Sequence, residues 1–82
     1  MIRYNRIKIV LVEKGKTSKW LANKIGKDKS TVSRWCSNDM QPTVQTLFKI
    51  AEILDVSPRE LLREEYDDNK ELEGVVNMEK EK

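Results

Sequence analysis

The chain has 82 residues, of which 38% are apolar, so it has room for one domain with one small core. It carries 16 Lys and Arg against 14 Asp and Glu, a net charge of +2, and it contains one cysteine and no histidine. These counts exclude a disulfide framework and remove the commonest metal ligand and general base, so we expect no enzyme, no metal site and no cofactor. The longest apolar run has four residues, far short of the roughly 18 of a membrane span, and no secretory pattern is present, which favours a cytoplasmic binding module.

The first predicted element is a helix over residues 6–14. Asn5 can cap its start, and the Lys14-Gly15 pair can end it. Residues 7–12 are mostly β-branched, so the same segment is also compatible with a strand. We favour the helix, because no other segment of the chain could pair with a strand.

Two further helices are predicted close together. Thr17 is an N-cap candidate for a helix over residues 18–25, which Gly26 can end. Asp28 can cap the next helix, residues 29–36, where its carboxylate also suits the positive end of the helix dipole. With so few residues between them, the two helices must cross steeply.

The remaining helices are predicted from caps and apolar spacing. After a polar loop over residues 37–42, Thr43 can cap a helix that continues to Leu54. Its apolar positions keep the i, i+3, i+4, i+7 spacing of one buried face: Leu47, Ile50, Ala51 and Leu54. Residues 57–60 form a capping box with proline at the first helical position, which predicts a fifth helix that ends near Tyr66.

Charge is unevenly distributed along the chain. Residues 1–62 hold 12 basic and 6 acidic side chains, whereas residues 63–82 hold 4 basic and 8 acidic ones. Between residues 14 and 34 there are seven basic side chains and one acidic side chain, a density that fits a polyanionic partner. A solvated helical face is the alternative interpretation. This asymmetry separates a domain over residues 1–62 from an acidic tail, residues 63–82, which its low apolar content predicts to be flexible.

The predicted helix over residues 29–36 has two distinct sides. Val32 and Trp35 can pack inward, with Trp35 in the core. The residues left on the outer stripe are polar or cationic: Lys29, Ser30, Ser33 and Arg34. Such a stripe suits the major groove of DNA, where Arg can bond guanine in a bidentate manner and Ser can bond several base edges. A phosphate contact is the alternative for Arg34.

One series of residues runs through the predicted helices at regular spacing: Thr17, Leu21-Ala22, Gly26, Ser30 to Trp35, Pro42-Thr43, Leu47, Ile50-Ala51 and Leu54 to Val56. In these residues the chain resembles the phage-repressor (Cro-like, Xre) helix-turn-helix family, over residues 5–62. The resemblance implies an all-α fold, a compact five-helix repressor-like DNA-binding domain in which residues 29–36 form the recognition helix. It also implies a bacterial or phage transcription regulator that binds double-stranded DNA as a homodimer.

The same resemblance implies which side chains contact DNA. Those expected to face bases are Lys29, Ser30, Thr31, Ser33 and Arg34, with Thr31 between base and phosphate contacts. Those expected to approach phosphates are Thr17, Ser18, Lys19, Ser37, Asn38 and Gln41, helped by backbone N–H groups at the start of the second helix. The main alternative function is an antitoxin or adaptor, in which the same fold is a protein-interaction module and the tail docks a protein partner.

The chain departs from the family pattern at several positions. Ser18 stands where many members have a longer Gln, which weakens that phosphate contact or transfers it to Lys19. Leu11 and Cys36 stand where an Arg on the first helix often pairs with a Glu, so we expect an apolar contact in place of the ion pair. We also expect Cys36 to be a small buried side chain and Trp20 to be partly packed; a redox-sensing thiol and a DNA-backbone contact are the respective alternatives.

Overall fold

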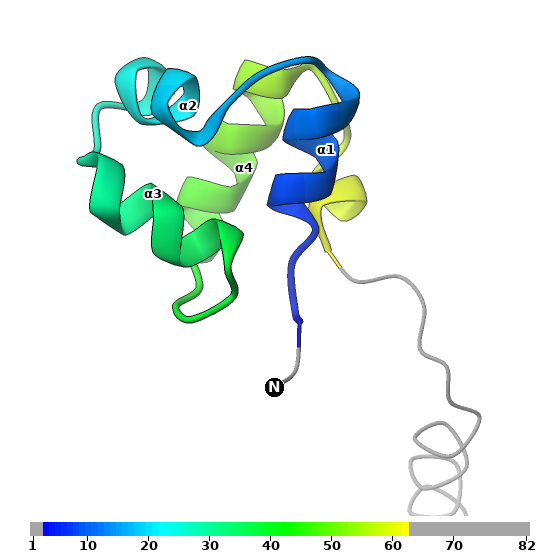
Figure 1. Cartoon of the computed structure of the whole chain (residues 1–82). Coiled ribbons are helices and arrows are strands. Elements are labelled where there is room, and N and C mark those ends of the chain that lie inside the picture. Colours follow the sequence, from blue (N-terminus) through cyan, green and yellow to red (C-terminus); the bar gives the residue numbers. More distant parts are fainter. Residues whose placement is uncertain (1–2, 63–82) are drawn as a thin grey trace, which may run out of the picture.

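The computed structural model describes residues 3–62, and within them the chain forms four α-helices and one short 3-10 helix (Figure 1). These elements are α1 (Ile7–Glu13), α2 (Ser18–Ile25), α3 (Lys29–Cys36), α4 (Val44–Leu54) and η1 (Pro58–Leu61). In this range the only β-type pairing is an isolated antiparallel bridge between Asn5 and Leu62. The all-α prediction is therefore confirmed, and the first apolar segment is a helix. None of the described helices is long and apolar enough to cross a membrane.

The fifth predicted helix is a 3-10 helix of four residues rather than an α-helix. The backbone N–H of Glu60 donates to the carbonyl oxygen of Ser57 at 2.9 Å, and this is the donor that the Ser57 hydroxyl would bond in a capping box. The Ser57 side chain accordingly makes no cap hydrogen bond, and the count of five α-helices is not confirmed. The predicted continuation to Tyr66 and the predicted tail over residues 63–82 lie outside the described residues.

Two helix caps and one turn form as their local sequence predicts. The Thr17 hydroxyl accepts the Trp20 N–H at 3.1 Å, and the Thr43 hydroxyl accepts the Thr46 N–H at the same distance. Gly26 ends α2 with a φ of +76°, in the left-handed region that glycine adopts without steric cost. Each threonine cap stabilises its helix by about 1 kcal/mol, because it satisfies a backbone donor that would otherwise have no partner inside the helix.

The other two predicted caps have different partners. Asp28 occupies the N-cap position of α3, but its side chain bonds no backbone N–H and instead accepts the Ser30 hydroxyl at 3.3 Å. Asn5 lies one residue before the N-cap of α1, yet its Oδ1 accepts the Ile7 N–H at 3.0 Å. Short polar side chains near a helix start have several local partners, so the sequence predicts a cap region more reliably than the bonded atom.

One core cluster joins all five elements. Its members are Ile7, Val10, Leu11, Leu21, Ala22, Val32, Trp35, Cys36, Leu47, Ile50, Ala51, Leu54 and Leu61. The predicted buried face of α4 lies entirely within this cluster, which confirms that prediction. Burying a Leu, Ile or Val side chain contributes about 1.5–3 kcal/mol each, so this cluster is the main source of stability in a domain of this size.

The arrangement of the helices places α2 and α3 side by side on one flank of the domain (Figure 1). α2 packs against both α3 and α4, while α1 packs against α3 and η1. The two ends of the described chain meet, because the Arg6 N–H donates to the Leu61 carbonyl oxygen at 2.8 Å. The α2–α3 pair is therefore supported by the rest of the domain and is not an isolated hairpin.

A buried polar network fixes the loop after α3. Asn38, whose φ is +64°, accepts the backbone N–H of Asn5 at 2.9 Å and donates to the carbonyl oxygen of Asn5 at 3.1 Å. The Asn5 amide in turn donates to the Trp35 carbonyl oxygen at 3.0 Å and to Gln41 Oε1 at 2.7 Å. In the described part of the chain every buried side-chain nitrogen and oxygen has a hydrogen-bond partner.

This network yields a stability prediction. Replacement of Asn38 with Gly keeps the positive φ accessible but leaves the backbone groups of Asn5 without partners, so we expect the free energy of unfolding to fall by about 1–3 kcal/mol. Urea denaturation measures this change. The matched control is Asn23→Ala, an exposed site on α2, which should shift the free energy of unfolding by less than about 0.5 kcal/mol. Equal effects of the two substitutions would contradict the role of the network.

Candidate nucleic-acid interface

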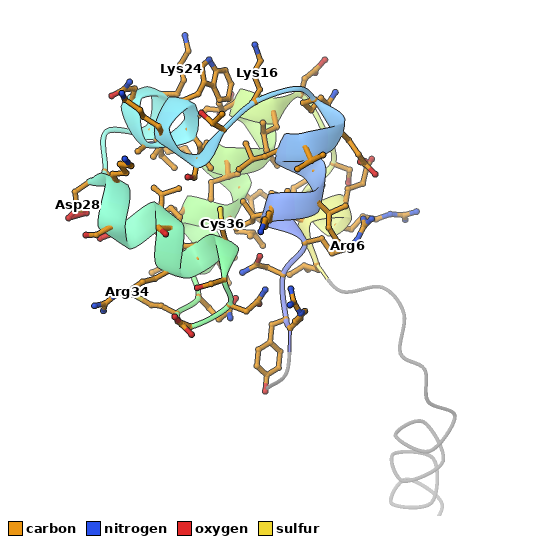
Figure 2. All side chains as sticks on the ribbon, viewed as in Figure 1. Arg6, Lys16, Lys24, Asp28, Arg34 and Cys36 are labelled. Carbon is orange, nitrogen blue, oxygen red and sulfur yellow. The ribbon has the colours of Figure 1, made fainter. Side chains whose placement is uncertain are left out.

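The outer face of α3 is polar and open to solvent. Val32 and Trp35 are only 0% and 4% exposed, as predicted, because they pack into the core cluster. With these two residues turned inward, the exposed residues of the helix are Lys29, Ser30, Ser33 and Arg34, and Thr31 is half-buried at the margin. Figure 2 shows the Arg34 side chain pointing away from the domain. The structure thus brings the predicted base-contact residues onto one accessible helix.

The turn between α2 and α3 sets the direction in which this face points. The backbone N–H groups of Gly26 and Lys27 both donate to the Ala22 carbonyl oxygen, at 2.9 and 3.2 Å. A Cβ on Gly26 would meet no atom within 4 Å, so glycine is favoured here by its backbone conformation rather than by crowding. Since Ala22 is buried and small, the two helices can approach closely at this corner.

Asp28 adds a negative charge at the start of α3. Its carboxylate is fully exposed, and the nearby Thr31 hydroxyl, with a smaller effect of Ser30, lowers its pKa. Asp28 is therefore ionised at neutral pH, beside the cation of Lys29. A phosphate is disfavoured at this end of α3, whereas the end that carries Arg34 has no such carboxylate on the helix itself.

The start of α2 carries three of the predicted phosphate contacts. Thr17 and Lys19 are exposed, and Ser18 is half-buried. The Thr17 hydroxyl accepts the Trp20 N–H, so its own proton remains available as a donor. Backbone N–H groups in the first turn of a helix also attract anions, which makes this segment suitable for a DNA phosphate.

The loop after α3 differs from the sequence-based prediction. Asn38 is 7% exposed, and its amide is bonded to Asn5, so its side chain is not free to reach a phosphate. Gln41 also bonds within the protein, to both Asn5 and Asn38. The Ser37 hydroxyl is exposed but lies 3.1 Å from the Asp39 carboxylate. No sequence signal indicates this network. Its bonds between Asn5 and the loop join residues that are 30 or more positions apart, and only the bonds between Gln41 and Asn38 are local.

Trp20 combines partial packing with two neighbouring cations. The ring packs against the core cluster, which confirms the prediction of partial burial. The ammonium of Lys16 lies 4.8 Å from the ring centroid, and that of Lys24 lies 5.8 Å from it. Figure 2 shows Lys24 of α2 and Lys16, from the segment before α2, extending from the same side of the domain. These contacts of the cation–π type hold two positive charges at this side.

A pocket of about 290 Å³ opens where α1, the start of α2 and the end of α3 meet. Its lining residues are Lys8, Leu11, Val12, Lys16, Thr17, Ser18, Ser33, Cys36 and Ser37. Leu11 and Cys36 both belong to the core cluster and line this one pocket. Burial raises the pKa of the Cys36 thiol, and the positive charge of Lys8 opposes that rise.

Comparison with known proteins shows the family. A helix-turn-helix family model matches residues 7–61, and the chain belongs to this family, of the Cro-like (Xre) type. A crystal structure from Bacteroides fragilis, described as a candidate DNA-binding protein, is 53% identical with a TM-score of 0.72, and the match covers 73% of this chain and 97% of that chain. A transcriptional regulator from Listeria innocua, 18% identical with a TM-score of 0.59, shares the fold, with 93% of this chain and 78% of that chain covered. No curated protein matches the chain.

The burial of Cys36 yields a prediction about its reactivity. The thiolate is the reacting species, and a raised pKa reduces the thiolate fraction at pH 8. We therefore expect the folded protein, in which the Cys36 side chain is buried, to react with iodoacetamide more slowly than free cysteine. Mass spectrometry of timed samples measures the rate, and full unfolding in urea should restore it. A rate that is unchanged by urea would contradict this assignment of Cys36 to the core.

Proposed function

We propose that this protein is a transcription regulator that binds double-stranded DNA in a sequence-specific manner, with α3 in the major groove. The observation that carries the proposal is the two-sided character of α3. Its apolar side is buried, while a run of hydroxyl and cationic side chains is exposed opposite it. These are the side-chain types that bond base edges in the major groove.

The proposed DNA contacts are the predicted residues whose side chains remain accessible in the structure. For the bases we propose Lys29, Ser30, Thr31, Ser33 and Arg34. For the phosphates we propose Thr17, Ser18, Lys19 and Ser37. Asn38 and Gln41 are left out, because their amides bond within the protein. Phosphate neutralisation would supply most of the affinity, and the contacts of α3 would supply the specificity.

We further propose that the protein binds as a homodimer. One helix in one groove reads only about 4–6 base pairs, which is too little for useful specificity in a genome. Two copies related by a twofold axis would read two half-sites about one helical turn apart.

The similarity to the Bacteroides fragilis protein supports DNA binding, since that protein is described as a candidate DNA-binding protein.

Selection of binding sites from random DNA duplexes tests the proposal directly. We expect enrichment of a pseudo-palindrome and a steep fall of affinity with salt. Absence of any enriched sequence would overturn sequence-specific binding. Failure to retain duplexes even at low salt would overturn DNA binding altogether and favour the adaptor or antitoxin interpretation.

Replacement of Arg34 with Ala tests base recognition. We expect binding to the selected site to weaken by about 1–3 kcal/mol and the preference at one base position to relax. Fluorescence anisotropy on a panel of single-base variants measures both effects. Arg59→Ala, an exposed arginine on η1, is the matched control and should leave affinity and preference unchanged. A loss that is equal on all sequences would assign Arg34 to a phosphate.

Replacement of Lys19 with Ala tests phosphate contact at the start of α2. Here we expect weaker binding to every duplex alike, together with a decrease of about 0.9 in the slope of log affinity against log salt. The control is Lys49→Ala, an exposed lysine on α4. If the two lysine variants showed the same slope, Lys19 would not lie on the DNA.

A further inference from the structure

We propose that the acidic tail, residues 63–82, docks on the exposed side of α1 of its own chain and lowers the affinity of the protein for DNA. The docking site is formed by Ile9 and Val12, which we call the α1 stripe. The docking itself does not depend on the proposed function, whereas its effect on affinity rests on the proposed DNA binding.

The α1 stripe is an apolar surface on the outer side of its helix. Ile9 is 48% exposed and Val12 is 69% exposed. The two residues are three positions apart, so they lie on the same side of α1, while the buried residues of the helix occupy the side that faces the core. An apolar pair in contact with water gains free energy when another apolar group covers it.

Basic side chains predominate around the α1 stripe. Between residues 3 and 16 five side chains are basic and one, that of Glu13, is acidic. Lys8 and Lys16 line the same pocket as Val12. An occupant that carries apolar side chains among carboxylates would match both the apolar character and the charge of this surface.

The tail has this composition. It carries 8 acidic side chains against 4 basic ones. Four of its five apolar residues lie within residues 72–78, and Glu71, Glu73 and Glu79 stand among them or next to them. The apolar residues of this segment can therefore cover the α1 stripe while neighbouring carboxylates meet the lysines beside it.

The described chain ends close to α1. The backbone bridge between Asn5 and Leu62 places the last described residue beside the segment that leads into α1, and Figure 1 shows this end of the domain next to that helix. Nine residues separate Leu62 from Leu72, and a segment of that length can span about 30 Å. Since α1 is only about 10 Å long, the tail can reach the whole stripe.

A second exposed apolar pair, Val44 and Phe48 of α4, fits the tail less well. The groove beside Phe48 is lined by Lys49 but also by Glu52, so its two charges balance. The surroundings of the α1 stripe carry a net positive charge instead. Charge complementarity therefore favours α1 as the site of the tail and leaves the α4 pair as a matched control.

A docked tail would lie next to the proposed DNA contacts. Val12 lines one pocket together with Thr17 and Ser18, both of which are proposed phosphate contacts. Carboxylates brought to this place repel a phosphate. If the tail is docked in about 70–90% of the molecules, the apparent affinity for DNA falls about three- to tenfold, because only the undocked fraction binds freely.

Nuclear magnetic resonance spectra of the full chain test the docking. We expect Ile9→Gln/Val12→Gln to change the amide chemical shifts of residues 72–78, because it removes the apolar surface that they cover. The control is Val44→Gln/Phe48→Gln, a pair of similar exposure (68% and 57%), which should leave these shifts unchanged. Signals of the core residues in the same spectra verify that both variants fold.

Three results would overturn the docking. Tail shifts that change in neither variant would show that the tail is not docked, and shifts that change with the α4 pair would place it elsewhere. A change that disappears on dilution of the protein would show that the tail docks on a second copy of the chain. Docking within one chain does not depend on protein concentration.

Substitutions within the tail test the effect on DNA binding. We expect Val75→Asn/Val76→Asn to tighten binding to the selected duplex about three- to tenfold, measured by fluorescence anisotropy. The substitution retains every charge of the tail, so a gain in affinity would come from release of the docked segment. Asn69→Ala, which also keeps the charge, is the control and should leave the affinity unchanged.

The outcomes separate this inference from the proposed function. If the wild type binds duplexes and Val75→Asn/Val76→Asn binds them no more tightly, the regulatory role of the tail is overturned and DNA binding stands. If no protein binds a duplex, the proposed function fails together with the effect of the tail on affinity. The chemical shifts of residues 72–78 decide the docking in either case.

Discussion

The burial of Val32 and Trp35 is the constraint on which the rest of this structure depends. Both side chains are almost fully removed from solvent, and together they attach the inner side of α3 to the core. Burial of these two side chains fixes the rotation of α3 about its axis. The opposite side of the helix must therefore face solvent. The hydroxyl and cationic residues of α3 are exposed for this reason and not because of any attraction among themselves.

The position of α3 depends on contacts at both of its ends. At the start, Gly26 in the left-handed conformation turns the chain sharply from α2, and at the end the network around Asn38 ties the following loop to the N-terminal segment. The second tie is specific because an amide buried without its partner costs about 1–3 kcal/mol. The short helix α3 needs such support, since eight residues form a stable helix only when they are packed against a domain.

In the proposed complex, the charged and polar side chains of the domain would serve two purposes, attraction of the duplex and selection of its sequence. Lysines on α2 and near its start surround Trp20 or extend into solvent, where they raise the local positive potential without demanding one partner. Arg34 and the serines of α3 have a narrower geometry, suited to individual base edges. Asp28 and Asp39 lie at the two ends of the α3 surface and limit where a phosphate can approach. The site is therefore shaped by its carboxylates as well as by its cations.

The sequence by itself determined the elements whose cause is local. Thr17 and Thr43 cap their helices with bonds to residues three positions away, and the apolar period of α4 defines its buried face without reference to any other helix. Where several neighbouring groups compete for one side chain, as at Asp28, the sequence predicted where the helix begins but not which hydrogen bond the side chain accepts. Only the tertiary structure decided the hydrogen bonds of Asn38 and the place of the pocket between α1 and α3, because both arise where segments remote in the chain come together. Burial, and hydrogen-bond partners that are far apart in the sequence, depend on how the helices pack against one another. The spacing of residues within one helix carries no information about that packing.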